Sequence, residues 1–207
     1  MFRVGRVAGV WFAPPSFADN RFDDPRGDYQ VLYVSSSLRG CFLETLCRFR
    51  PDMRVYVELA DIVGPDDFIP PEEVPMEWTE TRWLGQAHCE GRFANVYESE
   101  WISRFRTDLA PYYLAEGFPQ IDASVLMREA PRSITQQASR VIREDLNQYA
   151  GIHYPSRFGL ENENRAVFLS SVPVIQEPSS GPIDTKMPQL AEALEMLGLR
   201  FSTLAER

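Results

Sequence analysis

The segment Gly151–Arg157, with the sequence GIHYPSR, gathers several reactive side chains. His153, Tyr154, Ser156 and Arg157 supply an imidazole, a phenol, a hydroxyl and a guanidinium. The segment follows a predicted helix and precedes an apolar run, so we expect a loop, where binding and catalytic groups concentrate. Ser156 is a weak candidate nucleophile, because no base adjoins it and no G-x-S-x-G elbow surrounds it. A turn serine that caps a backbone group is the plain alternative, and His153 is interpreted as structural.

Two further side chains, Arg21 and Glu44, could act with this segment. Arg21 lies in a turn-rich stretch and could clamp a phosphate in bidentate fashion. The alternative is a surface arginine paired with Asp23 or Asp24. Glu44 lies at the edge of an apolar helical stripe, where a carboxylate is partly buried and needs a partner; the alternative is a solvated glutamate. Taken singly, each plain alternative is favoured, so the residues have to be weighed together.

The elements that must position these residues begin with a strand, a helix and a strand. Residues 29–35, YQVLYVS, alternate and are rich in β-branched and aromatic residues, which predicts a strand. Tyr33 on this strand is by default a core aromatic. The run LRGCFLETLCRF, residues 38–49, has apolar residues at helical spacing, with serines before it as caps and Pro51 to end it. Residues 54–60 alternate again and predict a second strand.

The second half of the chain contains a further helix, strand and helix. Residues 133–136, SITQ, resemble a capping box ahead of a helical apolar stripe, and Gly151 lies where a C-terminal cap belongs. Residues 166–174, AVFLSSVPV, predict a strand. A final helix spans about 188–197, and residues 199–204 predict a last short strand.

The middle of the chain is less regular. Residues 64–80 are rich in proline and acidic residues and predict an exposed, partly irregular insertion. Residues 95–118 contain aromatic side chains that we expect in the core. Because strands and helices do not alternate regularly, we predict an α+β fold, with residues 1–207 forming a single domain.

Composition narrows the function classes. The net charge of −9 argues against direct nucleic-acid binding, which normally uses a basic face. It permits an anionic small molecule held by a few arginines and backbone amides. No apolar run approaches the roughly 20 residues of a membrane span, and the N-terminus is a poor secretory signal, so we predict a cytoplasmic protein without membrane contact. The cysteines lack metal-ligand spacing and histidines are few, so we expect no metal site.

In this order, the residues resemble the RES domain family, named for its arginine, glutamate and serine. Arg21 stands in NRFDDP, Tyr33 in the strand VLYVSSS, Glu44 in the helix SLRGCFLETL, and Ser156 in GIHYPSR ahead of RAVFLSSV. The helix ITQQASRVIRED also looks like the family. The likeness covers about residues 15–175, with a loosely similar middle section, and GI-x-Y-P-S-R is its most specific part.

The resemblance implies a fold like the ADP-ribosyltransferase domain of diphtheria toxin and chemistry on NAD. Family members degrade NAD by hydrolysis or phosphorolysis, as toxins paired with Xre-type antitoxins that cover the active site. ADP-ribosyl transfer to protein has also been proposed for them. NAD is then a substrate, no resident cofactor is expected, and inorganic phosphate is a candidate co-substrate. Toxin–antitoxin assemblies of this kind favour a homo-oligomer.

The resemblance also implies roles for the candidate catalytic residues Glu44, Arg21 and Ser156. Cleavage of the nicotinamide–ribose bond has an oxocarbenium-like transition state, which the carboxylate of Glu44 would stabilise. Arg21 would bind the diphosphate, and Ser156 would bind the ribose or position Glu44. The remaining candidates share an expected contact with the substrate: Tyr33, Tyr154 and Arg157. An ADP-ribosyltransferase acting on a protein and a non-catalytic NAD-binding or interaction module stay open.

Overall fold

The computed structural model describes residues 1–7, 9–12, 19–50, 73–126, 131–169 and 174–202. A large mixed sheet with the strand order β5-β6-β7-β2-β1-β4-β8 forms its centre. In this sheet β5 and β6 are parallel, and the other pairings are antiparallel. Its strands are β1 (Phe2–Arg6), β2 (Gln30–Ser35), β4 (Arg82–Cys89), β5 (Phe93–Asn95), β6 (Gly151–Ser156), β7 (Gly159–Leu169) and β8 (Ile175–Pro182). A separate parallel pair consists of β3 (Glu73–Val74) and β9 (Arg200–Phe201).

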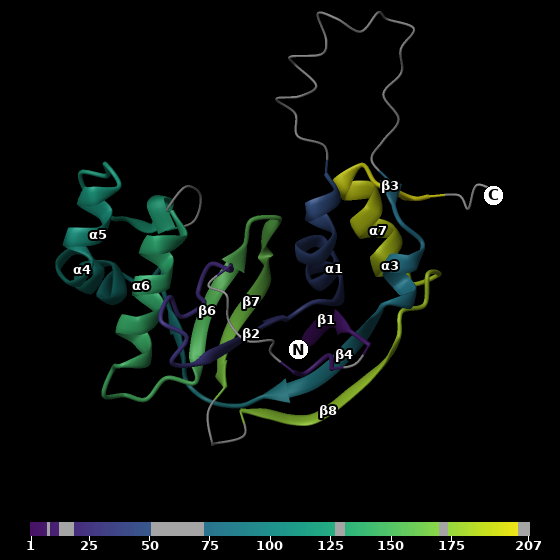
Figure 1. Ribbon diagram of the computed structural model, residues 1–207, viewed down its shortest axis with the longest axis horizontal. Coiled ribbons are helices and arrows are strands. Elements are labelled where there is room, and N and C mark those ends of the chain that lie inside the picture. Colours follow the sequence, from purple (N-terminus) through teal and green to yellow (C-terminus); the bar gives the residue numbers. More distant parts are fainter. Residues whose placement is uncertain (8, 13–18, 51–72, 127–130, 170–173, 203–207) are drawn as a thin grey trace, which may run out of the picture.

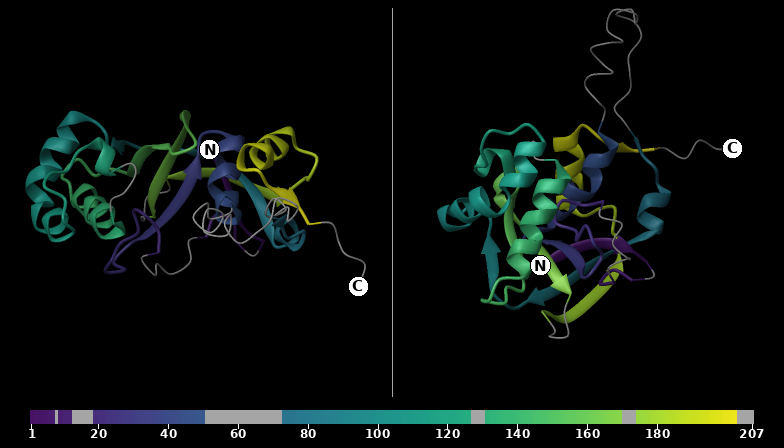
Figure 2. Two further views of the ribbon diagram at one scale, coloured as in Figure 1. Left: turned by 90° about the horizontal axis from the view of Figure 1, so that it is seen from above. Right: turned by 60° about the vertical axis from the view of Figure 1, so that its left-hand side comes forward.

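Helices cover the sheet at two separate places (Figure 1). The described helices are α1 (Leu38–Leu46), α3 (Glu77–Glu80), α4 (Ser99–Asp108), α5 (Ala110–Ala115), α6 (Arg132–Arg143) and α7 (Pro188–Leu197). Helix α6 packs on β6, while α1 packs on β1, β2 and α7. Figure 2 shows from above that α4, α5 and α6 lie at one end and α7 at the other. Each group has its own apolar core. A mixed sheet with segregated helices is an α+β fold, as predicted.

Helix α1 lies directly on the sheet because small and polar residues allow a close approach. The hydroxyl of Ser37 accepts the N-cap hydrogen bond from the Gly40 N–H at 2.9 Å and donates to Asn162 Oδ1 at 2.7 Å. A Cβ at Gly40 would lie 2.8 Å from the Ser35 hydroxyl. The predicted serine cap is confirmed. Residues Cys47–Phe49 continue α1 as one 3₁₀ turn.

The sheet face between the two helical groups carries two tyrosines from different strands. Tyr33 on β2 and Ile152 on β6 both pair with Ala166 on β7. Two residues further along β6, Tyr154 pairs with Asn164. Residues two apart on a strand, and residues paired across strands, point to the same side. Tyr33 and Tyr154 therefore share one face and lie diagonally across β7.

The expectation of a loop at GIHYPSR is wrong, because residues Gly151–Ser156 form strand β6. The prediction of Gly151 as a helix cap is also wrong: α6 ends at Arg143. At Gly151 a Cβ would lie 2.2 Å from the Ala166 carbonyl oxygen. This glycine is therefore required for a close approach between strands, which a local sequence pattern cannot distinguish from a cap.

The predicted capping box at residues 133–136 is wrong as well. Helix α6 begins at Arg132, and Pro131 at its N-cap provides no side-chain hydrogen bond. The hydroxyl of Ser133 instead donates to Glu116 Oε1 at 2.7 Å. A tertiary partner thus takes the side chain that the local pattern assigned to the cap.

Some of the remaining predictions of secondary structure are confirmed, and others fall outside the described residues. The final helix is confirmed, with Gly198 in the left-handed conformation at its end, and the last short strand is β9. Residues 95–118 include α4 and α5, and the buried side chains of Trp101 and Tyr113 confirm the expected aromatic core, whereas Tyr112 is exposed. Residues 54–60, 64–72 and 170–173 lie outside the described residues.

The described part of the predicted insertion, residues 73–80, is more regular than expected. It forms β3 and α3, and Trp78 is buried in the core beneath α7. Hydrophobic burial of this tryptophan outweighs the local proline and acidic content. Within the described residues, no helix has the length and apolar character of a membrane span.

Candidate functional site

The carboxylate of Glu44 is fixed by two strands of the sheet. Glu44 projects from α1, and its Oε1 accepts hydrogen bonds from Ser156 Oγ on β6 at 2.7 Å and from Asn164 Nδ2 on β7 at 3.1 Å. Its Oε2 is 4.0 Å from Arg157 Nε, and the side chain is 32% exposed. One oxygen therefore has two fixed donors, while the other has only a distant ion-pair contact. The expectation that a partly buried Glu44 needs a partner is confirmed.

The hydrogen bonds of Ser156 define what its hydroxyl can do. Its proton is donated to Glu44, and its oxygen accepts from the Phe158 N–H at 3.1 Å. Ser156 is buried, at 3% exposure. A hydroxyl whose only proton is donated to a carboxylate orients that carboxylate. The sequence shows no base next to Ser156, whereas the fold places the Glu44 carboxylate beside it, and this arrangement agrees with the positioning role considered from the sequence.

The charges of both Glu44 and Arg21 act on the phenol of Tyr154. Burial and the negative charge of Glu44 raise the pKa of Tyr154, while the positive charge of Arg21 opposes the rise. The ring of Tyr154 is 5.0 Å from the ring of Phe22, and the Arg21 guanidinium lies 5.5 Å from the Phe22 ring centroid. Phe22 thus lies between the predicted site residues Arg21 and Tyr154, and the charge of Glu44 acts on Tyr154.

Hydrogen bonds of its neighbours Asn20, Phe22 and Asp23 hold the turn that carries Arg21. Asp23 accepts hydrogen bonds from the backbone and side chain of Asn20, and Asp24 binds Arg140. Among the residues that the structure describes, none forms an ion pair with Arg21. The alternative of a surface arginine paired with Asp23 or Asp24 is therefore wrong for the described chain, and its guanidinium remains able to bind an anion.

Tyr33 fastens the Arg21 turn to the sheet. Its hydroxyl accepts from the Phe22 N–H at 2.8 Å and donates to Asp23 Oδ1 at 3.0 Å. Burial, together with the negative charge of Asp23, raises the pKa of Tyr33 well above its ordinary value, so the phenol stays protonated. Tyr33 is therefore more than the core aromatic expected by default, because its hydroxyl shapes the turn that carries Arg21.

Arg157 occupies the exposed side of Glu44. Its side chain is 63% exposed, and its Nη2 lies 2.8 Å from the Cys47 sulfur. The guanidinium also lies 5.0 Å from the Phe158 ring centroid. Arg157 thus has one weak contact to Glu44 and an exposed guanidinium.

Two residues at the site were missed from the sequence. Asn164 gives no local signal, because its role depends on strand pairing. Tyr97, between β5 and α4, was interpreted only as a core aromatic. Its hydroxyl is buried and has no hydrogen-bond partner among the described residues, and the charge of Arg21 acts on it. A buried polar group without a partner is costly, and such groups are frequent at functional sites.

The described residues contain no cluster of three or more histidine, cysteine, aspartate or glutamate side chains that could bind a metal ion. The polar groups at the site are a carboxylate, two arginines, hydroxyls and an amide. This set matches a sugar phosphate ligand, since carboxylates accept from sugar hydroxyls and arginines bind phosphate.

Comparison with known proteins identifies the family. The model of the RES domain family matches residues 2–182, which extends beyond residues 15–175 at both ends. The chain therefore belongs to the RES domain family. No curated protein matches it.

Proposed function

We propose that this RES domain binds NAD and cleaves the bond between nicotinamide and ribose. RES domains are associated with NAD-related toxin–antitoxin systems. The observation that carries the proposal is the fixed carboxylate of Glu44, with Oε1 bound by Ser156 and Asn164 and Oε2 facing partly exposed space. An aimed carboxylate beside arginines is what a cationic, phosphate-bearing nucleotide requires.

The reaction breaks the bond between C1′ of the ribose and the nicotinamide nitrogen. The electron pair leaves with neutral nicotinamide, and positive charge develops at C1′ in an oxocarbenium-like transition state. Glu44 stabilises this charge or holds a ribose hydroxyl, and its orientation by Ser156 avoids reorganisation during the reaction. Water or phosphate then attacks C1′, so the enzyme is an NAD glycohydrolase or an NAD phosphorylase.

The arginines and tyrosines serve substrate binding in this proposal. Arg21 binds the diphosphate, since its guanidinium forms no ion pair within the described chain, and Arg157 approaches from the exposed side. Tyr154 borders the nicotinamide or its ribose, close to both charged groups. The hydroxyl of Tyr33 is used by the Arg21 turn, which favours Tyr154 over Tyr33 as the aromatic surface for the nicotinamide.

The biological setting is part of the same proposal. The protein acts in the cytoplasm as the toxin of a toxin–antitoxin pair, and an Xre-type antitoxin covers the site around Glu44. The fold is proposed to resemble the ADP-ribosyltransferase domain of diphtheria toxin. NAD is the substrate, and no resident cofactor takes part.

The test uses purified protein, NAD labelled in its adenylate part, and buffers with and without inorganic phosphate. Release of nicotinamide is expected, with free ADP-ribose as the product of hydrolysis and a phosphorylated ADP-ribose as the product of phosphorolysis. Glu44→Gln should lower the rate roughly 100-fold or more, the cost of losing one aimed electrostatic group. The matched control is Glu161→Gln, which changes an exposed glutamate paired with Arg39.

Each outcome has a distinct meaning. Parent-like NAD consumption by Glu44→Gln overturns the assignment of Glu44. Adding cell lysate would reveal an ADP-ribosyltransferase, because the label would then move from NAD to protein. Calorimetric binding of NAD without nicotinamide release would instead identify a binding module.

A further inference from the structure

One face of helix α6 holds the turn that carries Arg21. Gln136 Nε2 donates to the Asn20 carbonyl at 3.1 Å, and Ser139 Oγ donates to the Phe22 carbonyl at 2.8 Å. These carbonyls belong to the residues on either side of Arg21. Positions three and four apart on a helix share one face, so α6 presents a short polar row to this turn.

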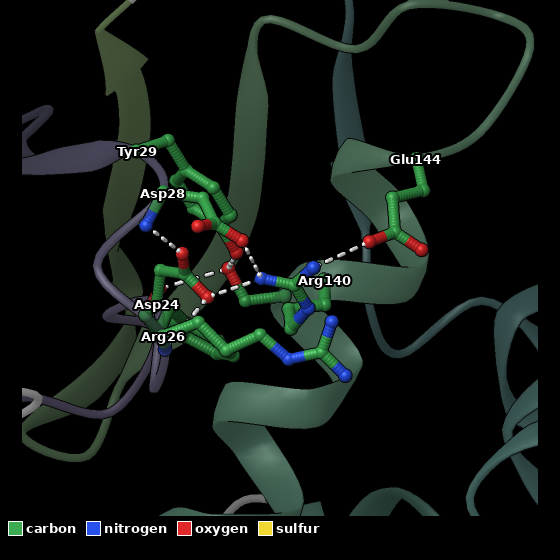
Figure 3. Close-up of polar contacts among 8 residues, drawn as sticks. Asp24, Arg26, Asp28, Tyr29, Arg140 and Glu144 are labelled. Carbon is green, nitrogen blue, oxygen red and sulfur yellow. Dashed lines mark hydrogen bonds and ion pairs between the residues drawn. The ribbon is translucent and has the colours of Figure 1, made fainter.

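Arg140 completes that row and joins the turn at a second point (Figure 3). Its Nη1 lies 2.7 Å from Asp24 Oδ1 and 2.9 Å from Asp28 Oδ2, and its Nη2 lies 2.8 Å from Glu144 Oε1. The side chains of Arg140 and Asp24 are 11% and 0% exposed. Asp24 also accepts from the N–H groups of Arg26 and Asp28. The guanidinium thus links α6 to both ends of the segment between Asp24 and β2.

The turn is fixed from the sheet side as well. Tyr33 binds the Phe22 N–H and the Asp23 carboxylate, and the Tyr29 hydroxyl lies 2.9 Å from Ser139 Oγ. Since Ser139 donates to Phe22, Tyr29 is the donor to Ser139. The backbone around Arg21 is therefore bound from two directions, while its guanidinium has no ion-pair partner in the described chain. Such an arrangement orders an anion-binding group before its ligand arrives.

We infer that Arg140, with Ser139, is a positioning residue for Arg21 and sets the affinity of the site for the diphosphate of its substrate. This inference rests on the proposed function. Arg140 acts through the turn and does not touch the substrate. Its planar fork is required because Nη2 on Glu144 holds Nη1 in place between Asp24 and Asp28, a fixed geometry that the flexible ammonium of a lysine cannot reproduce.

The primary variant is Arg140→Lys, which keeps the charge and loses the fork. We expect the KM for NAD to rise roughly tenfold while kcat changes less than about threefold, because a diphosphate contact is made in both the ground state and the transition state. Ser139→Ala, which removes only the donor to Phe22, should raise KM in the same direction and provides a test if Arg140→Lys folds poorly. The matched control is Arg104→Lys: Arg104 also joins two aspartates, Asp108 and Asp145, but does not contact the turn.

A double-mutant cycle distinguishes positioning from general stabilisation. If Arg140 acts through Arg21, then Arg140→Lys should add no more than about twofold to the KM of Arg21→Ala. Full additivity of the two effects, or an unchanged KM in both Arg140→Lys and Ser139→Ala, overturns the inference.

Hydrogen exchange gives a readout that does not depend on activity. The amides of Phe22, Asp23 and Asp28 should exchange roughly tenfold faster in Arg140→Lys and Ser139→Ala than in the parent, because local opening becomes easier. A parent protein that neither binds nor consumes NAD defeats the proposed function. Unchanged exchange in both variants defeats the positioning role, whatever the parent does with NAD.

Discussion

Ser156 and Glu44, 112 positions apart in the chain, meet in a 2.7 Å hydrogen bond. The donor comes from the end of a strand and the acceptor from a helix lying on the neighbouring part of the sheet. Together with the Asn164 amide, which also donates to Oε1, this bond fixes the position of the Glu44 carboxylate. The predictions below follow from this pair and from the network that places Arg21 near it.

Ser156→Ala should slow NAD cleavage without unfolding the protein. A hydrogen bond to a charged group contributes about 1.5–3 kcal/mol, which corresponds to roughly 10- to 100-fold in rate if it is required in the transition state. Asn164 still binds Glu44 Oε1 in this variant, so some activity should remain. Steady-state kcat and thermal unfolding are the measurements. The control is Ser179→Ala on the exposed strand β8. A parent-like kcat for Ser156→Ala would show that Ser156 does not contribute to the reaction.

Gly40→Ala should push α1 away from the sheet and disturb Glu44. The added Cβ would lie 2.7 Å from the Ser37 hydroxyl, 2.8 Å from the Ser35 hydroxyl and 3.1 Å from Asn162 Cβ. Overpacking of this kind costs about 1–3 kcal/mol, which offsets or exceeds the gain of about 1 kcal/mol in helix propensity. The free energy of unfolding, measured with urea, and kcat should both be lower than in the parent.

Gly181→Ala is the matched control for this crowding effect, because nothing lies within 4 Å of the added atom. Its free energy of unfolding should stay close to that of the parent. Equal stability of the Gly40 and Gly181 variants would show that α1 can move without cost.

Tyr97→Phe and Tyr113→Phe should differ in their effects on stability. The Tyr97 hydroxyl is buried without a described partner, so its removal should leave stability unchanged or raised by up to about 1 kcal/mol. The Tyr113 hydroxyl donates to the Arg106 carbonyl at 3.0 Å, and its loss should cost about 1 kcal/mol. If the Tyr97 hydroxyl contacts the substrate, Tyr97→Phe should also raise the KM for NAD. Loss of stability in Tyr97→Phe would reveal a partner in the protein.

Asp24 should make stability depend on acid pH. Burial alone would raise the pKa of Asp24, but hydrogen bonds from Arg140 and from the N–H groups of Arg26 and Asp28 outweigh it, so the pKa lies below its ordinary value. A carboxylate with a lowered folded-state pKa stabilises the fold fully above its unfolded pKa of about 4. That contribution is lost as pH falls through the folded-state pKa.

The measurement is urea unfolding of the parent and of Asp24→Asn from neutral to acid pH. The variant should be less stable at neutral pH, because Arg140 loses a buried partner. The difference between the two proteins should shrink as the pH falls below about 4. Asp19→Asn, an exposed aspartate ahead of the same turn, should follow the parent throughout. A constant gap between parent and Asp24→Asn would exclude this linkage.

The sequence by itself determined part of the local elements and the identities of the reactive residues. Alternation predicted β2, helical spacing predicted α1 and α7, and the order of Arg21, Glu44 and Ser156 indicated the family. These signals are readable because strand and helix periodicities depend on neighbours within a few positions. The matched interval, residues 2–182, agrees with that identification.

Only the tertiary structure decided how these residues combine. Strand pairing brought Asn164 beside Tyr154 and turned GIHYPSR from an expected loop into a strand, and packing of α6 brought Ser139 and Arg140 to the Arg21 turn. The hydrogen bonds of Ser139, Arg140 and Ser156 join residues more than a hundred positions apart. Their formation depends on sheet register and helix packing, which no local pattern encodes.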